Sequence, residues 1–309
     1  MSHFVKHRAG SWFIIANPTS GNRNFSKQWK EIQQLLTNKK IDFSVAFTQF
    51  SKHEIELVTT AIQQGFRNII SIGGDGTLHH VVNGIMLQRY VKTSDITIAV
   101  IPLGTGNDWI KTYNIPNNVE KSIEIIHRNK TILQDIGVLE TDTKSISYFN
   151  NVAGLGYDGY IVHKLNSLKR FGAVAYLLAG VSGLLFYKKS VFTIIFDDKK
   201  IETNCLMTLF GICKFSGGGM QFAKNVNSTD GFFDITIAKN LTIFDLILNI
   251  KNLYNGNIVH HKKIETHKTK KITVIPKTSK PFIQADGELV DTGKVTAKII
   301  EKAIHFVVN

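Results

Sequence analysis

The sequence predicts an α/β plus β fold, with an N-terminal doubly wound α/β domain followed by a mainly antiparallel β domain. In the first 130 residues, four short apolar runs each end at a polar loop, and apolar residues at helical spacing follow. From about residue 131 the pattern changes to period-two runs separated by turns. The length of 309 residues also suits about two domains. We therefore expect domains at residues 1–130 and 131–309, with the last residues a candidate for packing back on the first domain.

The first domain is expected to contain four parallel strands with helices between them. The strands are predicted at Trp12–Ala16, Phe43–Phe47, Asn68–Ile72 and Thr97–Ile101. The helices are predicted from Phe25 to Leu36, from Ile55 to Ile62 and from Leu78 to about Leu87, with another helical stretch after Asp108. Gly65 is expected just past the end of the second helix, where glycine favours the left-handed conformation. Alternation of strands and helices predicts a parallel sheet covered on both faces.

The second domain is expected to consist mainly of antiparallel strands. Period-two runs predict strands that include Ser147–Asn151, Ser190–Phe196, Cys205–Cys213, Phe232–Ala238, Lys271–Ile275 and Lys294–Ile300. Two helical segments interrupt them, at Tyr160–Tyr187 and Leu241–Tyr254. If both cysteines lie in one strand, they are about 26 Å apart, far beyond the roughly 7 Å limit of a disulfide. Reduced cysteines favour a cytosolic protein.

The composition indicates a globular protein with an anionic partner. Hydrophobic residues make up 43% of the chain and charged residues 20%, which excludes a disordered or collagen-like protein. The net charge of +13 favours nucleic acid, an anionic membrane or a phosphorylated substrate. The N-terminal apolar run Trp12–Ala16 is too short for a secretory signal. Glycines dilute the apolar segment Phe171–Tyr187, so a buried or interfacial helix is favoured over a membrane span.

Two glycine-rich loops follow neighbouring strands and carry the chemistry of phosphate binding. The loop Gly73-Gly-Asp-Gly-Thr77 lets backbone N–H groups approach anionic oxygens at the start of a helix. The loop Gly104-Thr-Gly-Asn-Asp108 repeats this chemistry, which disfavours the alternative of a mere tight turn. Ligands of such sheets bind beyond the carboxyl ends of the strands, so these loops should converge on one site. The sequence lacks both the Walker A spacing and the Gly-x-Gly-x-x-Gly pattern of dinucleotide folds.

Asp75 and Asp108 are candidates to hold Mg²⁺ at this site, directly or through water. The alternative for each is a structural role in a turn or as a helix N-cap. That alternative suits Asp108 better, because Asp108 could begin a helix. For Asp75, which is flanked by glycines, the functional role is favoured.

The ordered loops resemble the diacylglycerol kinase catalytic domain. The residues that carry the resemblance are Asn17-Pro-Thr-Ser-Gly21, Gly73-Gly-Asp-Gly-Thr-Leu78 with Asn83-Gly84, and Pro102-Leu-Gly-Thr-Gly-Asn-Asp108. More narrowly, the chain resembles the bacterial soluble lipid kinases related to diacylglycerol and sphingosine kinases. Motifs in the second half follow the same family order: Phe149-Asn-Asn-Val-Ala-Gly-Leu-Gly-Tyr-Asp158, Gly217-Gly-Gly-Met220, Thr229-Asp-Gly-Phe232 and Gln284-Ala-Asp-Gly-Glu288.

This resemblance implies an ATP-binding domain, a β-sandwich domain and an active site in the cleft between them. It implies nucleotide contacts at Asn17, Pro18, Thr19, Ser20, Gly21, Thr48, Gly73, Gly74, Asp75, Gly76, Thr77, Gly104, Thr105, Asn107 and Asp108. It places the catalytic base in the Asp-Gly-Glu motif, where Asp286 is the expected base and Glu288 the competing candidate. It also implies a structural Mg²⁺ held by the Asp230 carboxylate and the main-chain carbonyls of Asn227 and Phe232.

Two segments depart from the family pattern. His79-His80 stands where the family usually has Asn-Glu, and an imidazole cannot replace a carboxylate as a fixed acceptor. Adjacent helix residues point about 100° apart, so two polar helix residues near the cleft are favoured over a zinc site. The segment Ala223-Lys-Asn-Val-Asn-Ser-Thr229 replaces one that normally contains a proline and often another acid. Backbone carbonyl ligands tolerate such changes, so the metal site is still expected.

The expected reaction is transfer of the γ-phosphate of ATP to a lipid hydroxyl, most simply from diacylglycerol to phosphatidic acid. Loop amides would hold the phosphates, Mg²⁺ near Asp75 and Asp108 would offset charge, and Asp286 would accept the hydroxyl proton. Without the resemblance, Asp286-Gly287 would be interpreted only as a hairpin turn. Other acceptors remain open: a sphingoid base, ceramide, a prenol, phosphatidylglycerol or a soluble metabolite.

The expected partners are a lipid substrate and the inner face of an anionic membrane, to which a cytoplasmic enzyme would bind peripherally. Candidate basic contacts are Lys262-Lys263, Lys268, Lys270-Lys271 and Lys169-Arg170. The segment Phe171–Leu185, with Phe186 and Tyr187, either lines an acyl-chain groove or fills a core, and core packing is favoured. A nucleic-acid-binding protein is disfavoured because aromatics do not alternate with the basic residues. A catalytically inactive lipid-binding module is disfavoured by the presence of both Asp286 and Glu288, and related bacterial enzymes suggest a homodimer.

Overall fold

The computed structural model describes residues 10–21, 25–104, 107–166, 183, 187 and 189–309. The chain forms two compact units, one of residues 1–136 and 301–309 and one of residues 137–300. We call them unit 1 and unit 2. The chain leaves unit 1 along β5 (Thr131–Thr141) and returns to it along β17 (Val295–Val307).

Unit 1 is built on a parallel sheet whose strands lie in the order β2-β1-β3-β4-β17. The first four strands are β1 (Trp12–Ala16), β2 (Phe43–Phe47), β3 (Asn68–Gly73) and β4 (Thr97–Pro102). The predicted strands are therefore confirmed, with β3 and β4 each extending one residue further. The chain passes from β1 to β2 on one side and then crosses to β3 on the other side, so a topological switch point lies between β1 and β3.

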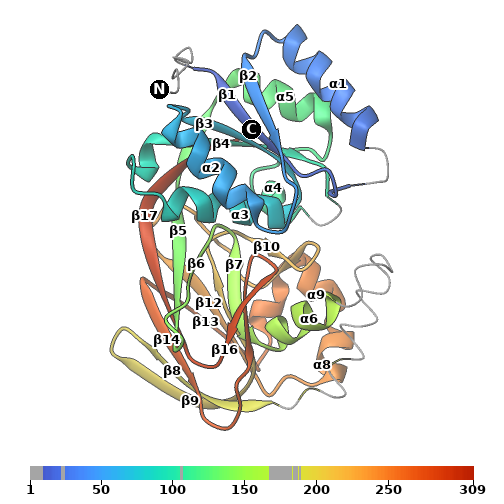
Figure 1. Cartoon of the computed structure of the whole chain (residues 1–309). Coiled ribbons are helices and arrows are strands. Elements are labelled where there is room, and N and C mark those ends of the chain that lie inside the picture. Colours follow the sequence, from blue (N-terminus) through green and yellow to red (C-terminus); the bar gives the residue numbers. More distant parts are fainter. Residues whose placement is uncertain (1–9, 22–24, 105–106, 167–182, 184–186, 188) are drawn as a thin grey trace. The chain divides into compact units, whose positions relative to one another are not determined.

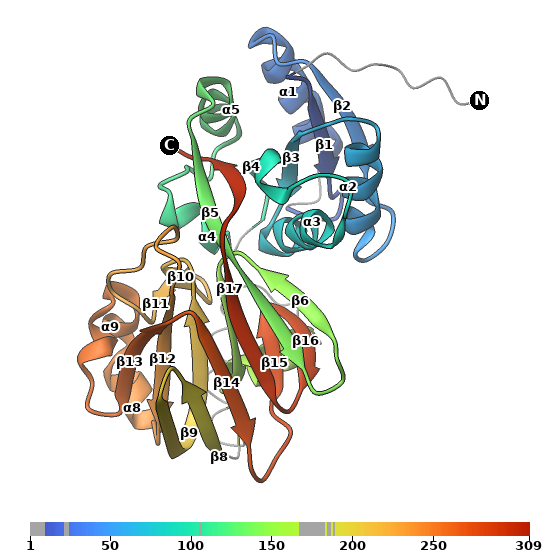
Figure 2. The same ribbon diagram turned by 90° about the vertical axis from the view of Figure 1, so that its left-hand side faces the viewer.

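Helices cover both faces of this sheet, as the sequence pattern predicts (Figures 1 and 2). The elements are α1 (Phe25–Asn38), α2 (His53–Gln63), α3 (Asp75–Leu87), a 3-10 helix (Thr93–Asp95), α4 (Asp108–Thr112) and α5 (Val119–Arg128). α1 packs with α5, and α2 packs with α3. α3 begins at Asp75, three residues earlier than predicted, because the extended backbone of Gly74 provides the N-cap position. Gly65 has φ +99° just past α2, as expected of a glycine at that position.

Unit 2 is a mainly antiparallel β-sandwich. Its further strands are β6 (Ile146–Phe149), β7 (Val152–Gly156), β8 (Ser190–Phe196), β9 (Lys199–Gly211), β10 (Phe215–Ser216), β11 (Met220–Gln221), β12 (Phe233–Lys239), β13 (Ile264–Thr269), β14 (Lys271–Pro276), β15 (Phe282–Ala285) and β16 (Glu288–Thr292). The first part of β9 pairs with β8, and its second part pairs with β7 and β12. β9 thus belongs to both runs of strands, β16-β15-β7-β9-β12-β13 and β9-β8-β14-β17.

Several predicted strands have different ends. The strand predicted at Lys294–Ile300 is β17, which continues to Val307. Two others differ for physical reasons. The strand predicted at Ser147–Asn151 ends at Phe149, because Asn150 and Asn151 form a turn whose N–H groups bind a carboxylate. The strand predicted at Cys205–Cys213 starts at Lys199 and ends at Gly211, and Cys213 lies beyond it. Both cysteines are nevertheless buried, and they are not joined to each other by a disulfide. Burial raises the pKa of the Cys205 thiol to about 11.

The helical predictions for unit 2 were wrong in their limits. The segment predicted as Tyr160–Tyr187 begins with α6 (Tyr157–Asn166), and most of its remainder lies outside the described residues. The segment predicted as Leu241–Tyr254 is two helices, α8 (Ile243–Leu248) and α9 (Ile250–Asn255). They separate at Asn249, whose φ of −109° and ψ of 17° are not helical, and a 3-10 helix follows at Asn257–His260. Within the described residues, no helix is both long and apolar enough to cross a bilayer.

Candidate active site

The carboxyl ends of the parallel strands in unit 1 are joined by backbone hydrogen bonds. Thr48 N donates to Ala16 O at 3.0 Å, Asn17 N donates to Ile72 O at 3.0 Å, and Leu103 N donates to Gly73 O at 2.9 Å. The residues that follow the four strands therefore lie next to one another in the spatial order β2, β1, β3 and β4. This confirms that the loops converge at one edge of the sheet.

Asn17 shapes the loop after β1 and ties it to α3. Its Oδ1 accepts hydrogen bonds from Thr19 N at 3.0 Å and Thr19 Oγ1 at 2.7 Å. Its Nδ2 donates to Thr77 Oγ1 at 3.3 Å, across the switch point. Ser20 N closes the same turn by donating to Asn17 O, with Pro18 between them. The side chain and the main chain of Asn17 thus both hold the loop in place.

Glycines allow the loops to pack backbone against backbone. A Cβ added to Gly104 would lie 2.9 Å from Gly74 Cα, and one added to Gly21 would lie 2.6 Å from Leu103 O. Both distances are shorter than real Cβ contacts, so larger residues would push the loops apart. A Cβ on Gly73 would collide with the Thr77 side chain. The N–H groups of glycines, which carry no side chains, can approach phosphate oxygens closely.

The carboxylate of Asp75 holds the loop that leads from β4 into α4. Its Oδ2 accepts from Asp108 N at 2.7 Å, and its Oδ1 accepts from Trp109 N at 3.4 Å. These contacts cap α4, so the capping role that sequence reasoning assigned to Asp108 is performed here by Asp75. Asp108 itself begins α4, is buried, and its Oδ1 accepts from Lys111 Nζ at 2.6 Å. A magnesium-holding role for either carboxylate stays a prediction.

Two further loop positions, Asn107 and Gly76, lie near this contact. Asn107 is buried, and its Nδ2 donates to Gly104 O at 2.8 Å, which fixes the turn before α4. Gly76 lies in the first turn of α3. Thr105 lies outside the described residues.

His79 and His80 lie in α3 and contact each other, with ring centroids 5.1 Å apart. His79 is buried, and its Nε2 is 3.3 Å from Asn83 Nδ2. Across the part of the chain that the structure describes, His, Cys, Asp and Glu form no group of three or more able to hold a metal ion. These contacts agree with the interpretation of His79-His80 as polar helix residues.

Asp286 lies in unit 2 at the tip of the hairpin formed by β15 and β16. Asp286 has φ +52° and Gly287 has φ +82°, the left-handed pair that a two-residue type I′ turn requires. The hairpin interpretation of Asp-Gly is therefore correct. The same turn presents the carboxylate to a second turn: Oδ2 accepts from Asn150 N at 3.1 Å, and Oδ1 accepts from Asn151 N at 3.0 Å and Val152 N at 3.2 Å.

Three backbone donors thus fix the position and orientation of the Asp286 carboxylate. Asp286 N in return donates to Val152 O at 2.9 Å. The side-chain Oδ1 of Asn151 lies beside this turn, is buried, and has no hydrogen-bond partner among the described residues. Glu288, the competing candidate, is half-buried at the start of β16 and pairs with Ala285.

A second carboxyl group behind this hairpin was missed by sequence reasoning. Gln284 Nε2 donates to Asp158 Oδ2, and Gln284 Oε1 accepts from Gly287 N at 2.9 Å. Gln284 is buried, so it links the first turn of α6 to the turn that carries Asp286. Desolvation raises the pKa of Asp158 to about 6, although its hydrogen bond with Gln284 acts in the opposite direction. Asp158 and Gln284 each lie inside a quoted motif, but a separation of 126 residues gave no signal of their contact.

The expected structural Mg²⁺ site lies around Asp230. Its Oδ1 accepts from Phe232 N at 3.1 Å, and its Oδ2 accepts from Lys268 Nζ at 2.6 Å. Asn227 Oδ1 accepts from Thr229 N and Oγ1, which folds the loop before Asp230. Asp234 lies near, with its buried Oδ2 3.7 Å from Lys268 Nζ, too long for a hydrogen bond. Burial raises the pKa of Asp234 to about 6, against the opposing charge of Lys268. Two carboxylates, one with an unsatisfied oxygen, fit the oxygen ligands of Mg²⁺.

Comparison with known proteins assigns this arrangement to a family. Residues 11–139 match the model of the diacylglycerol kinase catalytic domain. Residues 151–308 match the model of the YegS C-terminal NAD kinase beta sandwich-like domain. The chain belongs to the diacylglycerol kinase and YegS-like lipid kinase family. It is therefore a lipid kinase, a phosphotransferase with an alcohol group as acceptor, as the resemblance in the sequence implied.

Individual relatives of this lipid kinase extend over most of the chain. A diacylglycerol kinase of Staphylococcus carnosus is 27% identical over 277 residues, covering 89% of this chain and 87% of the relative. A Shewanella frigidimarina protein named "Probable lipid kinase YegS-like" is 28% identical over 256 residues, covering 82% of this chain and 80% of the relative. A crystal structure of a diacylglycerol kinase from Bacillus anthracis has a TM-score of 0.73 at 20% identity, with 98% of each chain covered. This last likeness shows the shared fold.

The raised pKa of Asp158 predicts a pH-dependent contribution to the stability of the lipid kinase. Because its pKa is about 6 in the folded state and 3.8 in the reference state, the folded state binds the proton more tightly. Stability from this group is present at pH below 4 and is lost as pH rises through 6. Asp158→Asn can still accept from Gln284 but carries no titrating group. The difference in free energy of unfolding between this variant and the wild type should therefore grow by about 2 kcal/mol, in favour of the variant, from pH 4 to pH 7. Urea unfolding at several pH values checks this, and parallel curves for both proteins would contradict it.

The carboxylates of Asp230 and Asp234 predict that Mg²⁺ stabilises the folded protein in the absence of nucleotide. At a concentration 100 times its dissociation constant, Mg²⁺ should raise the free energy of unfolding by about 2.7 kcal/mol. The effect should shrink as pH falls through about 6, because Asp234 then binds a proton. Thermal unfolding of the wild type, Asp230→Asn and the exposed control Asp142→Asn checks this. Equal stabilisation of all three proteins would place the ion elsewhere.

Proposed function

We propose that this lipid kinase transfers the γ-phosphate of ATP to the hydroxyl of diacylglycerol, with phosphatidic acid and ADP as products. The observation that carries the proposal is the Asp286 carboxylate, which three backbone N–H groups hold at a hairpin tip within the family's Asp-Gly-Glu motif. Relatives over most of the chain are named diacylglycerol kinases, which supports this acceptor.

The glycine loops of unit 1 support ATP as the phosphoryl donor. Phosphoryl transfer depends mainly on positioning and on neutralisation of charge. The loops at Asn17–Gly21, Gly73–Thr77 and Gly104 meet at the carboxyl ends of parallel strands, where nucleotide phosphates bind in such folds. The N-terminus of the 13-residue helix α3 adds the positive end of a helix dipole. Thr48 and Asn107 flank these loops.

Asp286 is the proposed general base. It would accept the proton from the acceptor hydroxyl while that oxygen bonds to the γ-phosphorus and the bond from phosphorus to the β–γ bridging oxygen breaks. The proton ends on Asp286 and the bonding electrons on ADP. Two oxygens held by fixed donors allow little rotation of the carboxylate, which favours a defined direction of proton transfer.

Mg²⁺ would supply charge neutralisation for the transferred phosphoryl group. Asp75 and Asp108 are the carboxylates proposed to hold it near the loops. A second, structural Mg²⁺ would be held by Asp230 with the main-chain carbonyls of Asn227 and Phe232. The fit of that site rests on its paired carboxylates and on the buried, unsatisfied oxygen of Asp234.

A different lipid hydroxyl is the second candidate acceptor, because some relatives are named lipid kinases without a stated lipid. The purified protein should therefore be incubated with ATP and Mg²⁺ over vesicles containing diacylglycerol, a sphingoid base, ceramide, a prenol or phosphatidylglycerol, with the products identified by mass spectrometry. Phosphatidic acid as the dominant product supports the proposal. Phosphorylation of another lipid alone, or of a soluble hydroxyl compound in a parallel screen, would overturn the choice of diacylglycerol.

A further inference from the structure

The outer surface of α8 and α9 is apolar. Phe244 and Leu248 are 74% and 82% exposed, and Ile247, Ile250 and Tyr254 are 46%, 39% and 44% exposed. We call these five residues the α8–α9 apolar face. A surface helix normally presents polar residues on the side away from the core. Five large apolar side chains on neighbouring short helices therefore mark an interaction surface.

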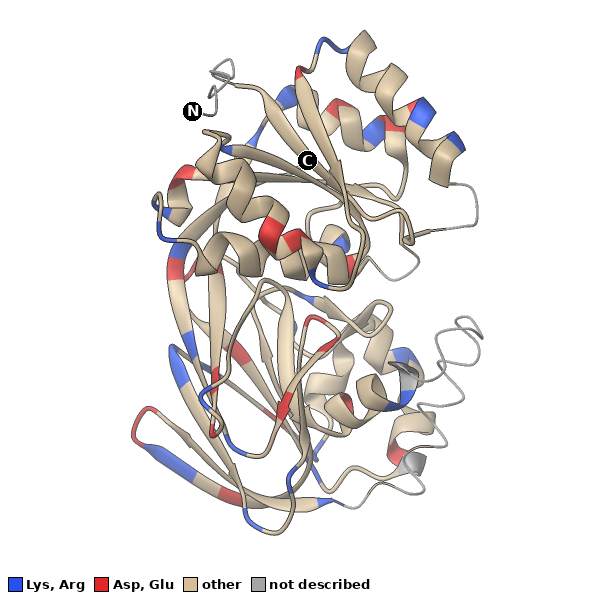
Figure 3. Cartoon of the chain, viewed as in Figure 1, with Lys and Arg blue, Asp and Glu red and all other residues tan. Residues whose placement is uncertain are grey.

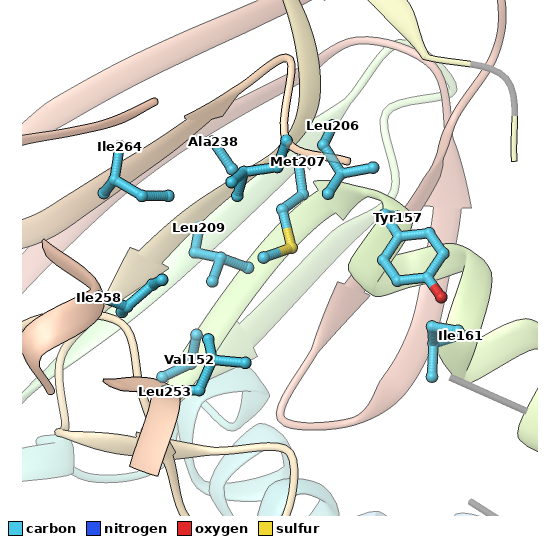
Figure 4. Packing of buried hydrophobic residues seen from close by; sticks show 11 residues of the cluster. Val152, Tyr157, Ile161, Leu206, Met207, Leu209, Ala238, Leu253, Ile258 and Ile264 are labelled. Atoms are coloured by element: carbon cyan, nitrogen blue, oxygen red, sulfur yellow. The ribbon is translucent and has the colours of Figure 1, made fainter. Parts of the chain in front are cut away.

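The opposite side of the same helices packs against the buried core of unit 2. Leu253 and Ile258 belong to the buried cluster of the sandwich that includes Val152 and Leu209 (Figure 4), and Leu246 of α8 packs against it. A capping box between Thr242 and Asp245 fixes the start of α8. The helices are thus anchored by their inner side, and their apolar outer side is presented on a fixed scaffold.

Exposed lysines lie close in sequence to this face. Lys251 lies on α9 and Lys262 lies beyond the following 3-10 helix, and both are exposed. Figure 3 shows the Lys and Arg residues of unit 2 spread over many of its elements. The segment 241–263 contains a single acidic residue, Asp245. Its Oδ2 accepts from Lys263 Nζ at 2.5 Å and its Oδ1 lies 3.8 Å from His261 Nε2, so its charge is neutralised locally. The rim of the α8–α9 apolar face is therefore positive.

A further lysine, Lys189 just before β8, feels the charges of this segment. Burial lowers the pKa of Lys189, and the charge of Lys263 lowers it further, while Asp245 opposes the shift. The surface thus combines apolar side chains with the positive charges of the exposed Lys251 and Lys262, which is the pattern of interfacial membrane contacts.

We propose that the α8–α9 apolar face docks unit 2 on an anionic lipid bilayer, with Phe244 and Leu248 entering the acyl boundary and the lysines on its rim contacting headgroups. The inference rests on the proposed function, since a lipid acceptor must be reached in a membrane. α8 and α9 have six residues each and so would lie in the interface. A second copy of the chain is a poorer occupant, because two-fold pairing of this face would bring its lysines together.

Vesicle binding tests the docking surface. The wild type should co-sediment with phosphatidylcholine vesicles that contain phosphatidylserine, and rising salt should weaken the binding. Phe244→Ser with Leu248→Ser should lower the vesicle partition coefficient by about tenfold per side chain. Lys251→Glu with Lys262→Glu should lower binding to anionic vesicles and leave binding to phosphatidylcholine alone unchanged. Leu87→Ser with Tyr90→Ser, which changes exposed apolar residues of unit 1, should bind as the wild type does.

The same variants separate docking from the proposed function. The Phe244 and Leu248 variant should phosphorylate a short-chain diacylglycerol dispersed in detergent as the wild type does, and should lose activity on long-chain diacylglycerol in vesicles. Unchanged vesicle binding by this variant would overturn the docking surface, as would a dimer in light scattering that this variant alone abolishes. Vesicle binding without phosphorylation of any lipid, in detergent or in vesicles, would overturn the proposed function and leave the docking surface supported.

Discussion

Asp286→Asn should lower kcat by about 10² to 10⁴-fold, with a much smaller change in KM for ATP. Asparagine retains one carbonyl oxygen but cannot accept the proton of the acceptor hydroxyl. The fold should survive, because asparagine tolerates the left-handed φ of +52° that this turn position requires. Its amide group would face one of the three backbone donors, at a cost of about 1 to 3 kcal/mol in stability. Steady-state kinetics together with circular dichroism check both effects.

Two further carboxylates of the same hairpin complete this test, one as a control and one as the competing candidate for the base. Asp291 accepts from the hydroxyls of Thr141 and Thr143, and Asp291→Asn should leave kcat within a few-fold of the wild type. Glu288→Gln tests the competing assignment. If Glu288→Gln abolishes turnover while Asp286→Asn keeps most of it, Glu288 is the base and Asp286 holds the turn.

Gly104→Ala should weaken ATP binding by about 100-fold. The added Cβ would lie 2.9 Å from both Gly74 Cα and Asn107 Oδ1, so the loops after β3 and β4 must separate. Overpacking of this kind costs about 1 to 3 kcal/mol, and a 100-fold change in affinity corresponds to about 2.8 kcal/mol. Titration calorimetry with a non-hydrolysable ATP analogue checks the change in dissociation constant.

Gly65→Ala provides a matched glycine control. Its Cβ would meet nothing within 4 Å, but its φ of +99° strains any other residue. This variant should lose about 1 kcal/mol of stability and bind the nucleotide as the wild type does. Equal affinity of the wild type and Gly104→Ala would show that the close approach of the glycine loops does not form the ATP site.

The sequence predicts the architecture of unit 1 well because local pattern and tertiary environment agree there. Buried parallel strands such as Trp12–Ala16 are continuous apolar runs, and each is followed by loop residues that cannot continue a strand. Convergence of the loops then follows from the topology. The hairpin at Asp286 is also readable, because Asp-Gly is the residue pair that a type I′ turn requires.

Contacts between distant segments could not be predicted. Asp75 caps α4 across 33 residues, and Gln284 binds Asp158 across 126 residues. Neither contact leaves a periodic or compositional signal, because both depend on how separate elements pack. The division of Leu241–Tyr254 into α8 and α9 was missed for a local reason: the apolar spacing continues through Asn249, although its backbone is not helical.

Phosphorylation of a lipid by the wild type and by Asp286→Asn is the most direct test of the central claim that this chain is an ATP-dependent lipid kinase. Both proteins should be incubated with Mg²⁺ and γ-labelled ATP over vesicles that contain diacylglycerol, and the label should then be partitioned between organic and aqueous phases. The label should appear in one organic-soluble product for the wild type and be nearly absent for the variant. Label that stays aqueous for the wild type, while ATP still binds, would contradict the lipid acceptor.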